Sequence, residues 1–336
     1  MELELIPSIT AAEWDATTAQ FDSTLVFHHS AWQNFLDETQ PGETLRFRVT
    51  HSGRTEGYFL ARLVRKGPFT ILGSPLPGWT TPYMGPILPS DFDQSAFLTA
   101  LEHLCLELRI DHVEISHPLL DPERMQAHGF RAIAHPTFLV PLNPDVNQMW
   151  ARLKNRNSIH RARREGLTAE ETADPSFVDR YYAQLREVFA KQQLVPTYSI
   201  ERVRSLVRHL YPHHLLAIEV RLGNQSVATG LFPYDARTVY FWGGASWLRY
   251  QALRSNHLLH WALMCRAAQR SVGAYDIGGT ILFKTRFGGT RVSRYVYSKS
   301  YSALARVSRG IYRSAFKVQQ VFRGRVSQVL NVTPRS

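Results

Sequence analysis

The stretch YDIGGTILFKTRFGG occupies residues 275–289 and has the most unusual composition in the chain. Four glycines, two phenylalanines, an aspartate and two cations fall within these 15 positions. Glycine permits tight turns, a positive φ and close approach of the backbone to a ligand. Lys284 stands between Phe283 and Thr285, so burial against apolar material would strengthen its field. From these residues alone, a ligand-binding loop and a glycine-rich hairpin with an exposed lysine are equally good interpretations.

Helical and extended patterns alternate before and after this stretch. Helices are expected at 176–191, 199–210 and 255–270. Strands are expected at 214–222, 225–234 and 238–246, and two short strands at 274–278 and 293–301. The three closely linked strands predict an antiparallel meander. Ser255 or Asn256 is expected to cap the third helix. Together these elements predict a mixed α/β sheet layer and exclude a doubly wound sheet.

The first half of the chain repeats part of this order. The first half is expected to contain a helix at 95–110, a strand at 112–116, a Gly-Phe pair at 129–130 and a strand at 137–142. The second half has the same order, with a helix at 255–270, a strand at 274–278, Phe-Gly-Gly at 287–289 and a strand at 293–301. Glu114 and Asp276 are 162 positions apart, and Phe130 and Phe287 are 157 apart. Such constant spacing indicates one supersecondary unit used twice. We therefore expect two similar domains, at 1–144 and 145–300, followed by a tail at 301–336.

Length and composition limit the class of protein. The chain has 336 residues, enough for two domains, and its 44% hydrophobic residues exclude a disordered chain. Its two cysteines exclude a disulfide scaffold or a cysteine-rich zinc module, and they fit a reducing compartment. No apolar run approaches the roughly 20 residues of a membrane span, and the first residues do not resemble a signal peptide. A soluble cytoplasmic protein is expected.

The net charge of +11 is concentrated at the C-terminal end. Residues 277–336 contain twelve basic residues and no acidic one. Helical spacing of apolar residues predicts a helix from Ser300 to Arg325, with a basic stripe formed by Arg306, Arg309, Arg313 and Lys317. The stripe fits a solvated surface, a contact with RNA, or a contact of residues 301–325 with anionic lipid at the inner face of a membrane.

Four segments resemble the Fem-type transferases of the GNAT acyltransferase superfamily. They are the 275–289 motif, LKNRNSIHRARREGL (153–167), TPYMGPIL (81–88) and FHHSAWQNFL (27–36), in consistent order over most of the chain. The resemblance implies two tandem GNAT-like domains, with the acceptor side in the first and the donor and catalytic side in the second. It also implies transfer of an acyl group, often an amino acid from aminoacyl-tRNA, to an amine of a peptidoglycan precursor or other peptide.

The resemblance places the family's Phe-Lys pair on Phe283 and Lys284, with Phe287 and Gly288 completing the motif. Attack of an amine on an ester puts negative charge on the carbonyl oxygen, and a fixed cation stabilises that charge. We assign this role to Lys284 and expect Phe283 to pack against the donor. Asp276 either orients the amine or accepts its proton, or it is a strand-end carboxylate paired with an arginine.

Donor binding is expected where the third helix begins. GNAT domains that use acyl-CoA have a glycine-rich loop there, which holds pyrophosphate. The segment RYQALRSNHLL (249–259) contains no glycine, which argues against CoA and for tRNA. Gln251 and Arg254 remain candidates for contacts with phosphate.

Further cations and a Gly-Pro segment are candidates for binding the acceptor or phosphate. Arg156, Arg163 and Arg164 share one face if 153–164 is helical, and they form either a phosphate-binding rim or a solvated surface. Tyr83 and Gly85 are expected to shape the acceptor pocket. Met84 occupies a position where relatives often have a basic residue, which argues against a phosphate-bearing acceptor.

Other chemistries are not indicated. The sequence has no histidine or cysteine set at ligand spacing and no Walker loop, so we assign no metal and no cofactor. The prediction is a Fem-like N-acyltransferase that uses aminoacyl-tRNA. The alternatives are an acyl-CoA-dependent N-acyltransferase acting on an amino sugar, and a non-catalytic protein that binds RNA or a membrane surface.

Overall fold

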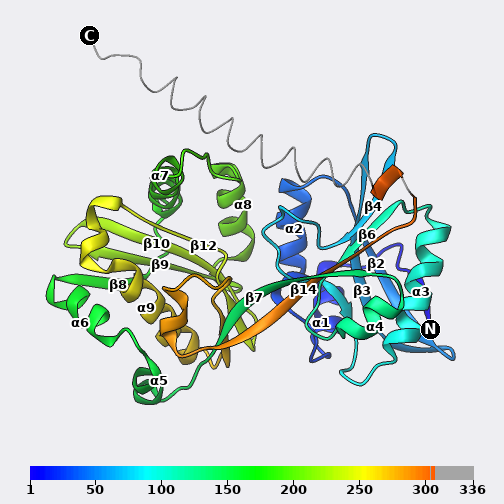
Figure 1. Ribbon diagram of the computed structural model, residues 1–336, viewed down its shortest axis with the longest axis horizontal. Coiled ribbons are helices and arrows are strands. Elements are labelled where there is room, and N and C mark those ends of the chain that lie inside the picture. The colour runs from blue at the N-terminus through cyan, green and yellow to red at the C-terminus, as the bar shows by residue number, and fades with distance from the viewer. Residues whose placement is uncertain (303, 307–336) are drawn as a thin grey trace, which may run out of the picture. The chain divides into compact units, whose positions relative to one another are not determined.

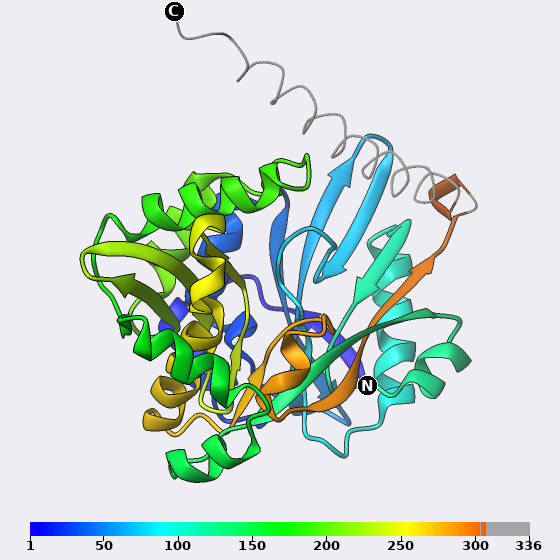
Figure 2. The same ribbon diagram turned by 60° about the vertical axis from the view of Figure 1, so that its left-hand side comes forward.

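A computed structural model describes residues 1–302 and 304–306, which divide into two compact units (Figures 1 and 2). Unit 1 contains Met1–His135 and the described residues from Ser293 onward, and unit 2 contains Pro136–Val292. Both units combine helices with mixed sheets, which confirms the predicted α/β fold class. The predicted C-terminal helix lies almost entirely outside the described residues, so it stays a prediction.

Unit 1 is built on one sheet with the strand order β1-β2-β3-β4-β6-β14, in which β5 also pairs with β3. Its strands are β1 (Glu2–Leu5), β2 (Glu43–His51), β3 (Arg54–Lys66), β4 (Phe69–Ser74), β5 (Gly85–Ile87), β6 (His112–Ile115) and β14 (Thr290–Ser300, shared with unit 2). Its helical segments are α1 (Ala11–Thr18), η1 (Val26–His28), α2 (Ser30–Thr39), α3 (Gln94–Glu107) and α4 (Pro122–Ala127). The apolar face of α3 packs with β2, β3, β4 and β6 in one buried cluster.

Unit 2 contains an antiparallel sheet in the order β12-β10-β9-β8 and a second group of strands in the order β7-β13-β11. Its strands are β7 (Arg131–Pro141, shared with unit 1), β8 (Leu167–Glu171), β9 (Leu215–Leu222), β10 (Gln225–Pro233), β11 (Thr238–Tyr240), β12 (Gly243–Ser246) and β13 (Ala274–Asp276). Its helical segments are α5 (Val146–Arg152), α6 (Arg156–Arg164), α7 (Phe177–Ala190), α8 (Ile200–Leu210), η2 (Leu248–Leu253), α9 (Ser255–Gln269) and η3 (Lys284–Phe287). Helix α9 covers one face of the antiparallel sheet, while α7 packs against β10 and β12 (Figure 1).

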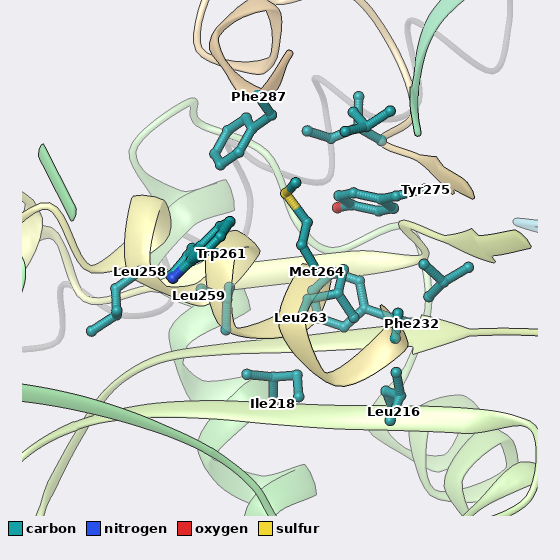
Figure 3. Packing of buried hydrophobic residues seen from close by; sticks show 14 of the residues in the cluster. Leu216, Ile218, Phe232, Leu258, Leu259, Trp261, Leu263, Met264, Tyr275 and Phe287 are labelled. Atoms are coloured by element: carbon teal, nitrogen blue, oxygen red, sulfur yellow. The ribbon is translucent and has the colours of Figure 1, made fainter. Parts of the chain in front are cut away.

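The core of unit 2 lies between α9 and the strands beneath it. Figure 3 shows side chains of α9 packed against Ile218 of β9 and Phe232 of β10, with Tyr275 and Phe287 above them. Phe287 belongs to η3 and is only 1% exposed. The 275–289 motif is therefore fixed to the core by its own aromatic residues.

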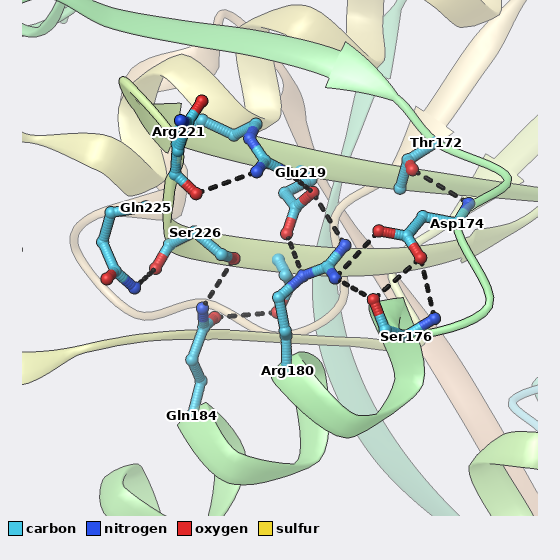
Figure 4. Close-up of polar contacts among 11 residues, drawn as sticks. Thr172, Asp174, Ser176, Arg180, Gln184, Glu219, Arg221, Gln225 and Ser226 are labelled. Carbon is cyan, nitrogen blue, oxygen red and sulfur yellow. Dashed lines mark hydrogen bonds and ion pairs between the residues drawn. The ribbon is translucent and has the colours of Figure 1, made fainter.

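A polar network attaches α7 to the same sheet. Glu219 is fully buried in β9 and accepts hydrogen bonds from Arg180 of α7, at 2.6 Å, and from Arg221, at 2.7 Å (Figure 4). Gln184, one turn further along α7, bonds to Ser226 and Thr229 of β10. Because the buried carboxylate has two cationic partners, its burial is compensated.

The two units repeat one motif, as the spacing predicted, but the strands predicted at 137–142 and 293–301 are exchanged between the two copies. In unit 1, β6 follows α3, pairs in parallel with β4 and pairs antiparallel with β14. In unit 2, β13 follows α9, pairs in parallel with β11 and pairs antiparallel with β7. Strand β7, from the first half of the sequence, therefore completes the motif of unit 2, and β14, from the end, completes that of unit 1. The domain limits at 144 and 300 stay predictions.

Two local predictions are wrong. Residues 238–246 form two strands instead of one, because β11 pairs with β13 whereas β12 pairs with β10. The three-stranded meander is therefore formed by β9, β10 and β12 only. Helix α9 is preceded by Arg254 in a left-handed conformation, and neither Ser255 nor Asn256 caps it. The chain therefore enters α9 through the positive φ of Arg254, without the side-chain hydrogen bond that the capping prediction required.

Candidate active site

The chain changes from one group of strands to the other between Phe241 and Trp242. The amide of Phe241 donates to the main-chain oxygen of Asp276 in β13, at 2.9 Å. The amide of Trp242 donates instead to the oxygen of Leu231 in β10, at 3.2 Å. The ring of Phe241 lies beside Lys284, with Nζ 4.3 Å from the ring centroid.

Lys284 is the buried cation of this site. It is 9% exposed, and its Nζ donates to the main-chain oxygens of Ile277, at 2.7 Å, and Gly278. Burial lowers the pKa of the ammonium to about 8, and the negative charge of Asp276 opposes this shift. An ammonium has three N–H donors, and residues 1–302 and 304–306 provide hydrogen-bond acceptors for two of them. One donor and the positive charge remain for a substrate oxygen.

Asp276 lies at the end of β13 and is 8% exposed. Its Oδ1 accepts hydrogen bonds from Thr137 Oγ1, at 2.6 Å, and from the amide of Gly278, at 3.0 Å. These two donors hold the carboxylate near Lys284 and fix the turn that supplies the lysine's carbonyl partners. The structure therefore places Asp276 beside the turn that Lys284 contacts, and its role in the reaction stays a prediction.

Aromatic rings enclose the segment that carries Lys284. The Phe283 ring lies 5.2 Å from Phe287 and packs edge-on against His257 of α9, at 4.7 Å. His260, one turn further along α9, lies 5.3 Å from Phe283. The predicted pair Phe283 and Lys284 thus lies together with Phe287, against the first turns of α9.

His260 is a buried residue that the sequence analysis missed. Its Nδ1 lies 2.7 Å from the hydroxyl of Tyr275. Burial lowers its pKa to about 3, and the nearby charges of Lys284 and His257 act in the same direction. His260 is therefore a neutral ring at neutral pH. Its spacing of three from His257 indicates a shared helical face, but nothing in the sequence indicates that residues 283–287 pack on that face.

Two glycines of the motif are required by the backbone. Gly278 has φ +65° and provides the carbonyl that Lys284 contacts. Gly288 has φ +79°, and a Cβ there would lie 3.0 Å from both Cβ and the main-chain oxygen of Arg152. The left-handed conformation favours glycine at both positions, and close packing adds a second reason at Gly288.

The predicted donor residues Gln251 and Arg254 are exposed and lie in the turn before α9. The main-chain oxygen of Gln251 accepts from the amide of Arg254, at 3.1 Å. Arg254 has φ +64°, which is unusual for a residue with a side chain. The charge of Arg254 acts on His257, as does that of Arg286, so these two cations lie near the aromatic cluster.

The three candidate cations of α6 are exposed and lie at its two ends: Arg156 at the start, and Arg163 and Arg164 in the last turn. Arg156 begins α6, next to Asn155, whose side chain contacts His257 of α9 at 3.0 Å. Arg163 lies near the other end of α6, over the ring of Trp150 at 5.9 Å. Of the three, Arg156 is the one adjacent to the site, while Arg163 and Arg164 belong to the last turn of α6.

Tyr83 and Gly85 lie in unit 1, where the second copy of the motif occurs. Tyr83 is buried, with the guanidinium of Arg294 over its ring at 5.7 Å. Gly85 has φ +105°, and a Cβ there would lie 2.8 Å from Cβ of His117. Gly85 thus has a structural requirement of its own in β5, and the acceptor role of both residues stays a prediction.

Comparison with known proteins agrees with this architecture. The sequence model of the acetyltransferase (GNAT) domain matches residues 153–289. These residues are a GNAT domain. The GNAT domain contains the candidate residues of α6, η2, α9 and the 275–289 motif. Among curated proteins, no sequence matches the chain significantly.

Solved structures extend the similarity to most of the chain. FemX is similar over 89% of this chain and 97% of its own, with a TM-score of 0.72 and 14% identity. The C-terminal domain of a putative lysylphosphatidylglycerol synthetase from Agrobacterium fabrum covers 89% of this chain and 95% of its own (TM-score 0.54, 14% identity). A tandem GNAT protein from the clavulanic acid biosynthesis pathway is similar over 90% of this chain and 99% of its own (TM-score 0.53, 12% identity). The predicted Fem-like tandem GNAT fold is confirmed.

Neither a membrane span nor a metal cluster is found in the part of the chain that the structure describes. None of its helices there has the length and hydropathy needed to cross a bilayer. Residues 1–302 and 304–306 also contain no group of three or more His, Cys, Asp or Glu placed to hold a metal ion.

Proposed function

We propose that the GNAT domain transfers an aminoacyl group from aminoacyl-tRNA to a primary amine of a peptidoglycan precursor or another peptide. The observation that carries this proposal is the buried ammonium of Lys284, fixed by two carbonyl oxygens and with a donor to spare. A buried, fixed cation suits a reaction in which negative charge develops on oxygen, because the charge is not screened by water. The similarity of the fold to FemX supports the aminoacyl donor.

The reaction needs one nucleophile and one leaving group. The acceptor nitrogen attacks the ester carbonyl carbon, a C–N bond forms, and the carbonyl oxygen gains an electron pair. The C–O bond to the ribose then breaks, the ribose oxygen gains a proton, and the nitrogen loses one. Lys284 stabilises the negative oxygen, Asp276 keeps the lysine protonated, and Phe283 excludes water. The proposal assigns no resident metal or cofactor.

A second candidate donor is acyl-CoA. It is favoured by the left-handed Arg254 immediately before α9, because that conformation lets main-chain N–H groups converge on phosphate. The lack of glycine at 249–259 argues for tRNA, whose phosphates the exposed Arg156 and Arg254 would contact.

Binding measured on the full chain separates the two donors. We would titrate a fluorescent RNA acceptor stem ending in CCA at several salt concentrations, with CoA as competitor. For a tRNA donor we expect a steep salt dependence, weaker binding in Arg254→Gln, no change in the exposed control Arg54→Gln, and indifference to CoA. Displacement of the RNA by CoA would contradict the tRNA donor and favour acyl-CoA as the donor.

Transfer itself is tested with labelled aminoacyl-tRNA and lysine-containing stem peptides. Label in the peptide, lost in Lys284→Met, is the expected result. Tight RNA binding with no transfer to any amine would contradict the enzymatic proposal and favour a binding protein on the same fold.

A further inference from the structure

His257 is held in one orientation and one tautomer by the residue that precedes another helix, α6. Its Nδ1 lies 3.0 Å from Nδ2 of Asn155, which immediately precedes α6. An amide nitrogen can only donate, so Nδ1 is the acceptor and the ring proton is on Nε2. His257 therefore has an N–H at Nε2, and this N–H has no partner among residues 1–302 and 304–306.

The side chain of Asn155 makes no other hydrogen bond with the residues that the structure describes. It is 3% exposed, its Oδ1 has no hydrogen-bond partner among the described residues, and its side chain does not cap α6. A buried amide with an unpaired oxygen costs free energy. The contact with His257 is thus what the Asn155 side chain provides.

The surroundings of His257 indicate what its N–H binds. The ring packs against Phe283, next to the buried Lys284, and lies at a stacked angle to Phe287. The charged groups that act on it are Arg254, before α9, and Arg286, in η3. The residue before α6, Asn155, presents a neutral amide to the ring. Two cations and an N–H donor together suit an oxygen of a phosphate group.

We propose that His257 is a donor-binding residue of the acyltransferase site, and that Asn155 is the positioning residue that makes it a hydrogen-bond donor toward phosphate. The inference rests on the proposed function for the identity of the ligand. The nucleotide end of a tRNA and the phosphates of CoA present the same oxygen chemistry.

The tautomer determines the sign of the interaction. With the proton on Nε2, the ring offers a positive N–H to an anionic oxygen. With the proton on Nδ1, it would offer a lone pair and repel that oxygen. Burial and the two arginines lower the pKa of His257 to about 4, so the ring acts as a neutral donor at physiological pH.

The tautomer is tested without any ligand by nitrogen NMR of the full chain labelled in histidine, with His257 assigned by its loss in His257→Phe. We expect the Nε2–H tautomer and no titration above about pH 5. A wild-type His257 that carries its proton on Nδ1, or that titrates near pH 6.5, would overturn the proposal.

Binding is tested with the CCA-ended RNA stem and with CoA as separate probes. His257→Phe keeps an aromatic ring but lacks the donor, and we expect about tenfold to hundredfold weaker binding of whichever probe the wild type binds. His213→Phe, at an exposed histidine, is the matched control and should leave binding unchanged. Unchanged binding in His257→Phe would overturn the donor role while leaving the proposed function intact.

Asn155→Asp distinguishes positioning from a merely structural role. A carboxylate at this position accepts from Nδ1–H, so it reverses the tautomer and raises the pKa of His257. Binding should weaken at pH 8 and recover at pH 6, where the imidazolium donates from both nitrogens. An equal loss at both pH values would contradict the positioning role. If neither probe binds the wild type, the proposed function fails, and the donor role fails with it.

Discussion

The ammonium of Lys284 donates to the main-chain oxygen of Ile277 at 2.7 Å, across a turn that begins at the end of β13. The amide of Gly278 in the same turn donates to Asp276. The strand end, the turn and the cation are therefore one hydrogen-bonded unit. A lysine tied to carbonyl oxygens keeps its charge in a fixed place, which is the property that a developing oxyanion requires.

Replacing Lys284 by methionine should abolish most turnover but little donor binding. Methionine is close in length and lacks the charge, so the loss falls on the transition state, and we expect a decrease in kcat of about 10²–10³. The measurement is single-turnover transfer of labelled aminoacyl groups, with Lys191→Met at an exposed position as control. A variant with unchanged turnover would remove Lys284 from the mechanism.

The rate of transfer should decrease as the pH rises through about 8. Burial lowers the pKa of Lys284 to about 8, and only the protonated form stabilises an oxyanion. The acceptor amine must be unprotonated, so a profile of kcat against pH should rise and then fall. Lys284→Arg does not titrate in this range, and any activity that it retains should lack the falling limb. A falling limb that persists in this variant would belong to another group.

Substitution of Gly288 by alanine should destabilise unit 2 more than the same change at Gly279. Both glycines have nearly equal φ, +79° and +77°, so the backbone strain of about 1 kcal/mol is common to both variants. A Cβ at Gly279 meets no atom within 4 Å, whereas one at Gly288 lies 3.0 Å from the main chain of Arg152. Urea denaturation should show an additional loss of about 1–2 kcal/mol for Gly288→Ala. Equal losses of unfolding free energy in Gly288→Ala and Gly279→Ala would show that Arg152 moves away from the new Cβ without cost.

The stability of the protein should decrease as the pH falls from about 6.5 toward 3, and His260 should contribute to this decrease. Its pKa in the folded state is about 3, below that of an unfolded histidine, so the unfolded state binds more protons in this interval. The largest slope from one such group is about 1.4 kcal/mol per pH unit.

The measurement is urea denaturation at pH 7 and pH 5, comparing the wild type with a double variant, His260→Phe and Tyr275→Phe, which removes both partners of the buried hydrogen bond. The double variant should show a smaller difference between the two pH values. His213→Phe, which changes an exposed ring, should behave as the wild type. An identical pH dependence in the double variant would assign the effect to other buried histidines, such as His117.

The sequence by itself determined the local elements and the repeat. Helix α9 and strands β9 and β10 lie within about one residue of their predicted limits, because hydrophobic periodicity and turn residues are properties of consecutive positions. The resemblance of the 275–289 motif to the Fem-type transferases also implied that Phe283, Lys284 and Phe287 belong to one site. Their association needs only a short turn, so it is encoded within 15 residues.

The tertiary structure decided which segments meet. The separation of β11 from β12 between Phe241 and Trp242 results from pairing with strands that come before and after them in the chain. The completion of unit 2 by β7 has the same origin. The contact of Asn155 with His257 joins residues 102 positions apart. Such choices depend on the free energy of long-range packing and pairing, which no single stretch of sequence expresses.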